Sequence, residues 1–326
     1  MSSTSSGTPA PSFHYPLDAK LRFDHLQTKA THNSYHVDTN GGMVLAWAYT
    51  QAKLTDQLTT QGVRSIELDV HYNKFVPRME VFHEPIVDEG STCRVFADCL
   101  KEIRTWSDAH PAHEPLFLQI EPKDPPDLMP LDAYWKILEA ELLAVWPKER
   151  IITPDLVQGS AATLREAVLD HGFPTLGELR GKILFAVDNA AEFRAAYLMP
   201  SGDLKGRLLF VNSSPTDAFG AVSILNDPTT DADAIKQGLA AHFLVRTRAD
   251  SDSVEAQAND THRRDAALAS GAQIISTDYP APVLANGYVV TIPDGKPSRC
   301  NPVTAPPECT AEDIENPAFM TDPKGP

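Results

Sequence analysis

The sequence is poor in basic residues, with 28 Lys and Arg against 44 Asp and Glu, and its formal net charge is −16. Because Lys and Arg are needed to neutralise nucleic-acid phosphates, this balance argues against a nucleic-acid partner. It also disfavours strong electrostatic adhesion to anionic membranes. No apolar run approaches the roughly 20 residues of a transmembrane helix. Polar residues follow Met1 directly, so no signal peptide is visible.

The sequence also lacks internal linkers, low-complexity runs and a repeat period, which argues against a solenoid. Segments with little apolar patterning lie only at the two ends. Residues 1–16 are rich in Ser, Thr and Pro, and residues 294–326 are rich in Pro. We therefore expect a flexible tail over 1–16, a single domain over 17–293 and a Pro-rich extension over 294–326.

Cysteine is scarce, but the four cysteines form two closely spaced pairs. Three connectivities are available, and the two local loops, Cys93–Cys99 and Cys300–Cys309, are the simplest. The second bridge would pin the extension, which has little core of its own. The alternative is four free thiols in a cytosolic protein. Disulfides predict an exported protein, secreted or periplasmic, whose signal is not part of this chain.

Short apolar segments alternate with helical patterns along the chain. Several, such as Ile183–Val187, are near-continuous apolar runs, which are typical of parallel strands buried on both faces. Strands are predicted over 26–31, 65–70, 116–121, 150–153, 182–187, 208–211, 242–246 and 273–277. Eight strands alternating with helices predict a (β/α)8 TIM barrel. A doubly wound sheet is the main alternative, but no glycine-rich dinucleotide or P-loop motif supports it.

The helices between these strands carry apolar stripes at helical spacing. One stripe consists of Phe96, Leu100, Ile103 and Trp106. Further helices are predicted over 132–146 and over 262–270, the latter ending at a glycine that can form a C-cap. These stripes are best interpreted as core.

Polar side chains stand at the carboxyl ends of three predicted strands. His32 and Asn33 follow the first, Glu67 and Asp69 end the second, and Glu121 ends the third. Residues two apart in a strand share a face, so Glu67 and Asp69 point the same way, about 6.6 Å apart. Barrel enzymes build their sites at this end of the strands, and we expect these groups to meet on one rim. Each alone has a structural alternative, such as a turn or an amide contact.

Three carboxylates held close together repel one another unless a cation joins them. Oxygen ligands favour Ca²⁺ or Mg²⁺ over zinc, and a flexible mixed set favours Ca²⁺ over Mg²⁺. His32 and His83 add two imidazoles whose ordinary pKa is about 6.5, which suits a general base and a general acid on opposite sides of a phosphorus. The inventory therefore predicts a metal-dependent phosphoesterase.

The ordered set of Thr31-His32-Asn33-Ser34-Tyr35, Glu67-x-Asp69, His83 and Glu121 resembles the phosphoinositide-specific phospholipase C superfamily, in particular its bacterial calcium-dependent branch. The resemblance extends from about residue 21 to residue 280. It implies a PLC-like phosphodiesterase barrel.

The resemblance also implies roles for individual residues. His32 would lie beside the attacking hydroxyl and donate a hydrogen bond to phosphate, and His83 would protonate or stabilise the leaving oxygen. The implied calcium ligands, one of which doubles as base for the inositol 2-hydroxyl, are Asn33, Glu67, Asp69 and Glu121.

Other polar residues near the ends of predicted strands are candidates for binding the substrate headgroup or phosphate. They are Lys123, Arg246, Arg248, Asp278 and Tyr279. The alternative for each is a surface or strand-end salt bridge.

The implied reaction is an attack of the inositol 2-hydroxyl on phosphorus, which gives a cyclic inositol phosphate and diacylglycerol. The substrate would be phosphatidylinositol or a related phosphodiester. Because the protein is acidic, we expect only transient membrane contact, by insertion of the loop Met43–Trp47 or not at all. We also expect a monomer.

Two alternatives differ in class or substrate. In a glycerophosphodiester phosphodiesterase, the first histidine is usually followed by Arg-Gly and the second by Asp. Here Asn33-Ser34 and Glu84 occupy those places. The second alternative is a non-catalytic barrel that binds sugar phosphates, which the presence of both histidines and of every ligand disfavours.

Overall fold

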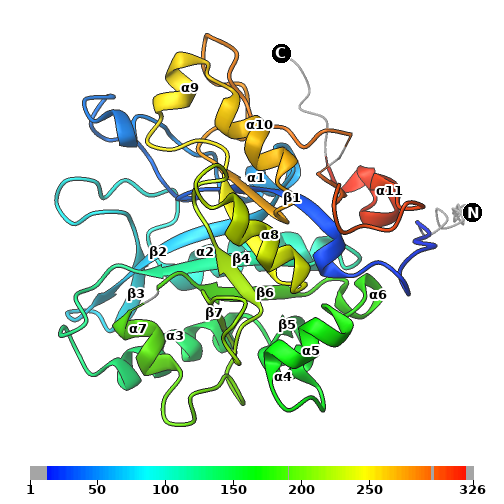
Figure 1. Cartoon of the computed structure of the whole chain (residues 1–326). Helices are drawn as coiled ribbons and strands as arrows, with labels where there is room; N and C mark the ends of the chain where they lie inside the picture. Colours follow the sequence, from blue (N-terminus) through cyan, green and yellow to red (C-terminus); the bar gives the residue numbers. More distant parts are fainter. Residues whose placement is uncertain (1–12, 190, 295–296, 321–326) are drawn as a thin grey trace, which may run out of the picture.

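The computed structural model describes residues 13–189, 191–294 and 297–320. Most of the predicted tail, residues 1–12, lies outside the described residues, as do positions 295–296 and 321–326 of the predicted extension. Mostly parallel strands curl around a common axis with helices packed outside them (Figure 1). The predicted barrel class is confirmed.

The strands are β1 (Leu26–Thr31), β2 (Val63–Asn73), β3 (Arg78–Val81), β4 (Leu116–Pro122), β5 (Ile151–Ile152), β6 (Ile183–Val187), β7 (Phe210–Val211), β8 (Val222–Ile224), β9 (Leu244–Arg248), β10 (Ile274–Thr277) and β11 (Ser298–Cys300). The α-helices are α1 (Leu54–Thr59), α2 (Phe96–Ala109), α3 (Leu131–Val145), α4 (Pro154–Gln158), α5 (Leu164–His171), α6 (Leu176–Leu179), α7 (Glu192–Tyr197), α8 (Ala232–Ala240), α9 (Val254–Ala258), α10 (His262–Ala269) and α11 (Ala311–Ile314). Four 3-10 turns cover Phe23–His25, Leu45–Trp47, Lys148–Arg150 and Pro317–Phe319.

Parallel pairing runs through β8, β9, β10, β1, β2, β4 and β6. The far edge of β6 pairs with β5 at its start and with β7 at its end. A parallel bridge between Asn212 and Val222 then joins β7 to β8, so the pairing returns to its starting strand. The barrel is therefore complete but narrowly joined between β7 and β8.

Two predicted strands are shorter than expected, and the segment predicted over 208–211 forms only the two-residue β7. The segment predicted over 150–153 forms only the two-residue β5, because Thr153 already caps α4, accepting a 3.2 Å hydrogen bond from the Leu156 amide. Pro154 at the first helical position favours the same boundary. The strand β8 was not predicted, because its three residues are too few to show a pattern. It completes the barrel beside β7.

The two helical stripes predicted most clearly pack on the barrel. Phe96, Leu100, Ile103 and Trp106 of α2 are all buried, as are Trp135, Leu138 and Leu142 of α3. The C-cap predicted after α10 is also present, since Gly271 has a φ of 81°. The burial of these stripes confirms their interpretation as core.

The Pro-rich segment after residue 296 packs against the barrel. Its strand β11 pairs antiparallel with the start of β1, with Cys300 opposite Leu26. Both predicted disulfides, Cys93–Cys99 and Cys300–Cys309, are bonded. In the described part of the chain, no helix is long and apolar enough to cross a membrane.

Candidate active site

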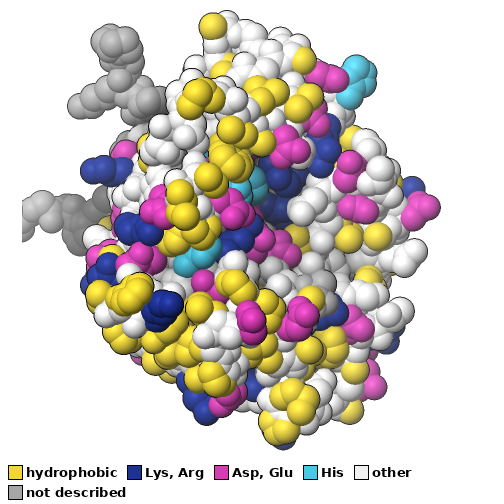
Figure 2. All heavy atoms as spheres, turned by 90° about the vertical axis from the view of Figure 1, so that its left-hand side faces the viewer, with side chains coloured by type: hydrophobic (Ala, Val, Ile, Leu, Met, Phe, Trp, Pro, Cys, Tyr) yellow, Lys and Arg dark blue, Asp and Glu magenta, His cyan; other side chains and the backbone are white. Residues whose placement is uncertain are grey.

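The carboxyl ends of the strands surround a hollow in the surface. Figure 2 shows acidic, basic and histidine side chains at the centre of this face, with hydrophobic side chains around them. The register explains why the acidic groups meet, because Asp69 of β2 lies directly opposite Glu121 of β4. Glu67 lies two residues earlier on the same face of β2.

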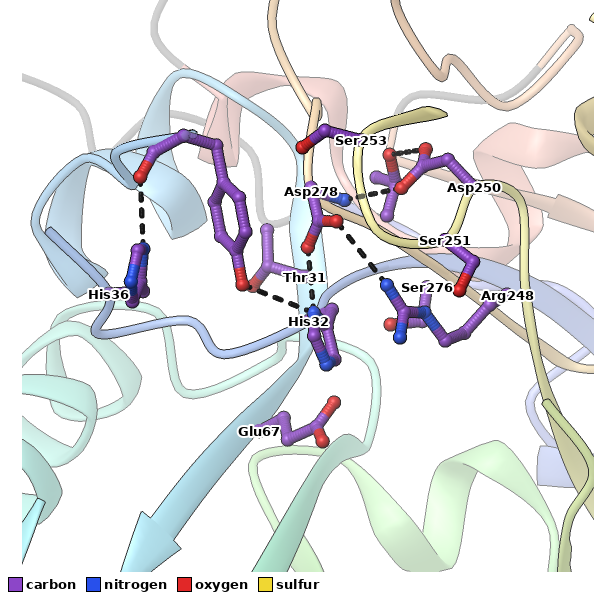
Figure 3. Close-up of polar contacts among 12 residues, drawn as sticks. Thr31, His32, His36, Glu67, Arg248, Asp250, Ser251, Ser253, Ser276 and Asp278 are labelled. Atoms are coloured by element: carbon purple, nitrogen blue, oxygen red, sulfur yellow. Dashed lines mark hydrogen bonds and ion pairs between the residues drawn. The ribbon is translucent and has the colours of Figure 1, made fainter. Parts of the chain in front are cut away.

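His32 is held by a carboxylate at the end of β10. Its Nδ1 donates to Asp278 Oδ1 at 2.7 Å, and Tyr49 Oη lies 3.2 Å from the same nitrogen (Figure 3). The second oxygen of Asp278 accepts from Arg248 Nη2 at 3.3 Å. The Asp278 amide donates to Asp250 Oδ1 at 2.8 Å, so a second carboxylate fixes the backbone. This arrangement leaves His32 Nε2 for substrate.

Burial shapes the protonation of this pair. Burial, together with the Arg248 guanidinium, lowers the pKa of His32 well below its usual range. Burial raises the pKa of Asp278 to about 6, although Arg248 opposes the shift. A neutral imidazole donating from Nδ1 to a carboxylate therefore fits the geometry near neutral pH.

The turn after β1 places Asn33 beside β2. The Ser34 amide donates to the Glu67 carbonyl at 3.0 Å, and the Glu67 amide donates to Ser34 Oγ at 2.8 Å. Asn33 has a φ of 40°, a region that Asn tolerates better than most residues. The His-Asn-Ser order thus turns the chain sharply while the turn stays fastened to Glu67.

Three carboxylates lie close enough to share a cation. One oxygen from each of Glu67, Asp69 and Glu121 lies within 4.8 Å of the others. Asp69 is fully buried, and neither of its carboxylate oxygens accepts a hydrogen bond from a described residue. Lys123 Nζ lies 3.3 Å from Asp69 Oδ2 and 2.8 Å from Glu121 Oε1. Arg246 Nη2 lies 2.5 Å from Glu67 Oε2.

The electrostatics of this cluster favour a further positive charge. Three carboxylates face two side-chain cations, which leaves one negative charge uncompensated. Burial, with the Glu121 carboxylate, raises the pKa of Asp69 well above its usual range. Burial lowers the pKa of Lys123, but the neighbouring carboxylates outweigh it and raise the pKa overall. Oxygen donors with an unsatisfied buried carboxylate fit a hard cation such as Ca²⁺.

The predicted substrate residues divide into two groups. Lys123 lies in the cluster, whereas Arg248 pairs with Asp278, which holds His32. Arg246 is buried and forms an ion pair with Glu67, so its charge already balances one of the carboxylates. Tyr279 is not brought into the cluster, because it is buried and its Oη donates to Ser253 Oγ at 2.8 Å.

His83 stands two residues beyond the end of β3. Its Nδ1 is 2.9 Å from Asp88 Oδ2, and its ring meets Trp47 edge-on with the ring centroids 5.6 Å apart. Burial and the Lys123 ammonium lower its pKa, although Asp88 opposes them. His71, which shares strand parity with Glu67, instead bonds backbone carbonyls and stacks on Phe82.

Several residues of the site were not predicted from the sequence. Tyr49 and Asp88 stand in loops, where no strand pattern signals their position. Asp188 did carry a signal, because it directly follows the apolar run of β6. Burial and the Glu121 carboxylate raise the pKa of Asp188 to about 7, and its Oδ2 accepts from Gln119 Nε2 at 2.9 Å.

A family model described as phosphoinositide phospholipase C, Ca²⁺-dependent, matches residues 75–302 of this chain. The matched range includes His83 and Glu121. It begins after β2, so the geometry described above, and not the match, supports the residues on β1 and β2. Among curated proteins, none matches the chain.

Solved structures share the fold. A calcium-dependent phosphoinositol-specific phospholipase C from Pseudomonas sp is 19% identical, with a TM-score of 0.60 over 90% of this chain and 100% of that chain. A Ca²⁺-dependent phosphatidylinositol-specific phospholipase C from Streptomyces antibioticus is 20% identical, with a TM-score of 0.58 over 80% and 95%. A phosphatidylinositol-specific phospholipase C from S. aureus is 13% identical, with a TM-score of 0.52 over 94% and 95%. At these identities the likeness establishes the barrel fold.

Proposed function

Because this chain belongs to the Ca²⁺-dependent phosphoinositide phospholipase C family, as its motifs predicted, we propose that it cleaves phosphatidylinositol to a cyclic inositol phosphate and diacylglycerol. The observation that carries the proposal is the juxtaposition of two groups on one rim. The three carboxylates of β2 and β4, among them Asp69 with no hydrogen-bond partner among the described residues, lie on the same rim as the His32–Asp278 pair. Metal ligands and a positioned base are what an internal attack on phosphorus requires.

The reaction forms one bond to phosphorus and breaks another. His32 accepts the proton of the inositol 2-hydroxyl at Nε2, while that oxygen attacks phosphorus. The bond from phosphorus to the glycerol oxygen breaks, and His83 gives a proton to the departing oxygen. Asp278 keeps His32 in the required tautomer through its 2.7 Å bond to Nδ1. Lys123 and Arg248 supply positive charge near the phosphoryl oxygens.

Asn33, Glu67, Asp69 and Glu121 would hold Ca²⁺, and Ca²⁺ is favoured over Mg²⁺ by the flexible mixed oxygen set. When bound, the ion lowers the pKa of the attacking hydroxyl and offsets charge on the phosphoryl oxygens. The protein itself fixes the positions of the charged groups around the ion. Its carboxylates and cations are held by ion pairs within the rim.

Phosphorus NMR of phosphatidylinositol turnover tests the proposed function directly. With calcium we expect a cyclic phosphodiester as the first product, and with excess chelator we expect no turnover. Restoring calcium after chelation should restore the rate, which shows that the protein remained folded. An acyclic phosphomonoester as the first product, or an unchanged rate in chelator, would contradict the proposal.

We also propose that the rim of the hollow touches the lipid surface through apolar loop tips. Met43, Phe75 and Ile86 are 83%, 86% and 93% exposed and lie on three different loops at this end of the barrel. These loops are neighbours. Asn40 Nδ2 donates to the Val87 carbonyl at 3.0 Å, and a cavity of about 310 Å³ is lined by Phe75, Pro85 and Leu128. Apolar contact suits this protein, whose acidic charge repels anionic lipid.

Charge placed on the loop tips should weaken activity on vesicles. For Phe75→Asp and Ile86→Asp, we expect roughly 30-fold weaker vesicle binding, because each loses about 2 kcal/mol of apolar burial. Hydrolysis of soluble glycerophosphoinositol should change little by comparison. The matched control is Leu143→Asp on the outer face of α3, which is 46% exposed. Equal losses on both substrates, or in the control, would exclude lipid contact by these tips.

The two disulfides support an extracytoplasmic location, because such bonds persist in oxidising compartments. We propose that the protein acts as a secreted or periplasmic monomer. We further propose that residues 17–293 form the catalytic unit. The segment from 294 onward would be a strap that Cys300–Cys309 closes into a loop and that β11 joins to β1.

A further inference from the structure

A tight turn after His83 brings Asp88, five residues later in the chain, back against the His83 ring. The backbones of Glu84 and Asp88 exchange two hydrogen bonds of 3.0 Å across the turn. Ile86 at the tip has a φ of 72°, a conformation that a β-branched residue rarely adopts. Strain of this kind persists only where the surroundings fix the backbone. The turn places Asp88, which is completely buried, against the ring of His83.

Asp88 is shared by two imidazoles. Its Oδ2 lies 2.9 Å from His83 Nδ1, and both of its oxygens lie 3.0 Å from His36 Nε2. The other nitrogen of His36 lies 2.9 Å from the Tyr49 carbonyl oxygen. His36 is buried, and its ring packs against Tyr49 with the ring centroids 4.5 Å apart. A continuous polar chain therefore runs from the Tyr49 backbone to His83.

The two nitrogens of His36 differ in their partners. One lies beside a backbone carbonyl and the other beside the Asp88 carboxylate, so His36 fixes Asp88 from the side away from His83. His83 differs, because its Nε2 has no hydrogen-bond partner among the described residues while its Nδ1 donates to Asp88. A chain built only to fasten the loop would not leave one ring nitrogen free beside the hollow.

We propose that Asp88 and His36 are positioning residues for His83, which they hold with Nε2 toward the leaving group of the substrate. The inference rests on the proposed function. As the bond from phosphorus to the glycerol oxygen breaks, the proton on His83 Nε2 passes to that oxygen. Asp88 fixes the ring by accepting from Nδ1. His36 holds Asp88 in turn, with both carboxylate oxygens 3.0 Å from its Nε2.

The test compares two leaving groups. The alkoxide of diacylglycerol needs a proton as it departs, whereas nitrophenolate, a much weaker base, does not. For Asp88→Asn we expect kcat on phosphatidylinositol to fall by at least about tenfold more than kcat on the nitrophenyl ester of inositol phosphate, within the ~10²–10⁴-fold range of a general acid. His36→Gln should show the same selectivity to a smaller extent, and KM should change less than kcat.

A double-variant cycle shows whether Asp88 acts through His83. If it does, Asp88→Asn should have almost no further effect on phosphatidylinositol turnover in a His83→Ala background. The matched control is His113→Gln, a buried histidine whose two nitrogens contact Ser107 Oγ and the Glu114 carbonyl away from the site. That variant should not distinguish the two leaving groups.

The outcomes separate this inference from the proposed function. If the unmodified protein forms no cyclic product from either substrate, the proposed function fails. If it does form the product, but Asp88→Asn lowers both substrates equally or adds fully to His83→Ala, only the positioning role is overturned. Circular dichroism of each variant identifies loss of fold, and in that event His36→Gln, which retains the carboxylate, decides by the same two-substrate comparison.

Discussion

Replacing His32 with alanine is expected to lower kcat on phosphatidylinositol by about 10²–10⁴-fold, with a much smaller change in KM. The reason is that the His32 ring lies on the rim and is held there through its Nδ1, so that its Nε2 remains for the substrate. Asp278 accepts from Nδ1 at 2.7 Å, and Arg248 holds Asp278 in turn. Initial rates measured by phosphorus NMR at saturating calcium check this expectation. Asp278→Asn should produce a smaller loss in the same direction.

Two measurements separate loss of chemistry from loss of structure. Calcium binding followed by calorimetry should persist in His32→Ala, because the carboxylates of β2 and β4 are untouched. His110→Ala should retain activity, because this imidazole hydrogen-bonds the Trp106 carbonyl and packs against Trp106 and Phe319, away from the site. A loss below tenfold in His32→Ala would show that another group accepts the proton.

Replacing Glu315 with alanine is expected to destabilise the protein by about 3–5 kcal/mol, although the residue is remote from the active site in sequence. Arg64 is fully buried beneath the barrel, and its Nε lies 3.0 and 2.9 Å from the two oxygens of Glu315. The variant leaves this guanidinium buried without its carboxylate. Thermal unfolding should show a Tm lower by roughly 5–8 °C for a chain of this length.

A neighbouring carboxylate sets how large this loss becomes. Burial and the Glu315 charge raise the pKa of Glu114 to about 8, and one of its oxygens lies 3.8 Å from Arg64 Nε. Without Glu315, Glu114 can ionise and partly replace the lost charge, so the lower end of the range is the more realistic. Glu312→Ala is the matched control, because Glu312 is exposed on α11, the helix that ends just before Glu315. Its effect should stay within about 0.5 kcal/mol. If Glu315→Ala shifts Tm as little as the control does, the buried ion pair with Arg64 does not contribute the predicted stability.

The barrel and most of the rim were predictable because they depend on local pattern. An apolar run in the sequence predicts a buried parallel strand. A polar residue at the carboxyl end of such a strand lies on the rim, because all the parallel strands end there. Glu67, Asp69 and Glu121 could therefore be placed together before any coordinates were known. The pairing of the cysteines followed in the same way from short loops.

The rest depended on tertiary contacts that leave no periodic signal. Asp88 reaches His83 only through a strained turn, and Tyr49 reaches His32 from a loop. Arg246 was predicted to bind substrate, yet its pairing with Glu67 depends on two strands that are far apart in sequence. The strand β8 was not predicted, because three residues are too few to show a period.

The narrow join between β7 and β8 has a mechanical consequence. A barrel opens most readily where its strands pair least. Here one parallel bridge and a few hydrogen bonds, such as those from the Ser213 amide and Oγ to the Val222 carbonyl, join the two sides. Along the ring this join lies across from β1, which pairs with β10 over four residues. Thermal opening of the barrel is thereby directed to the wall that carries no catalytic residue, and the wall that aligns the reacting groups stays closed.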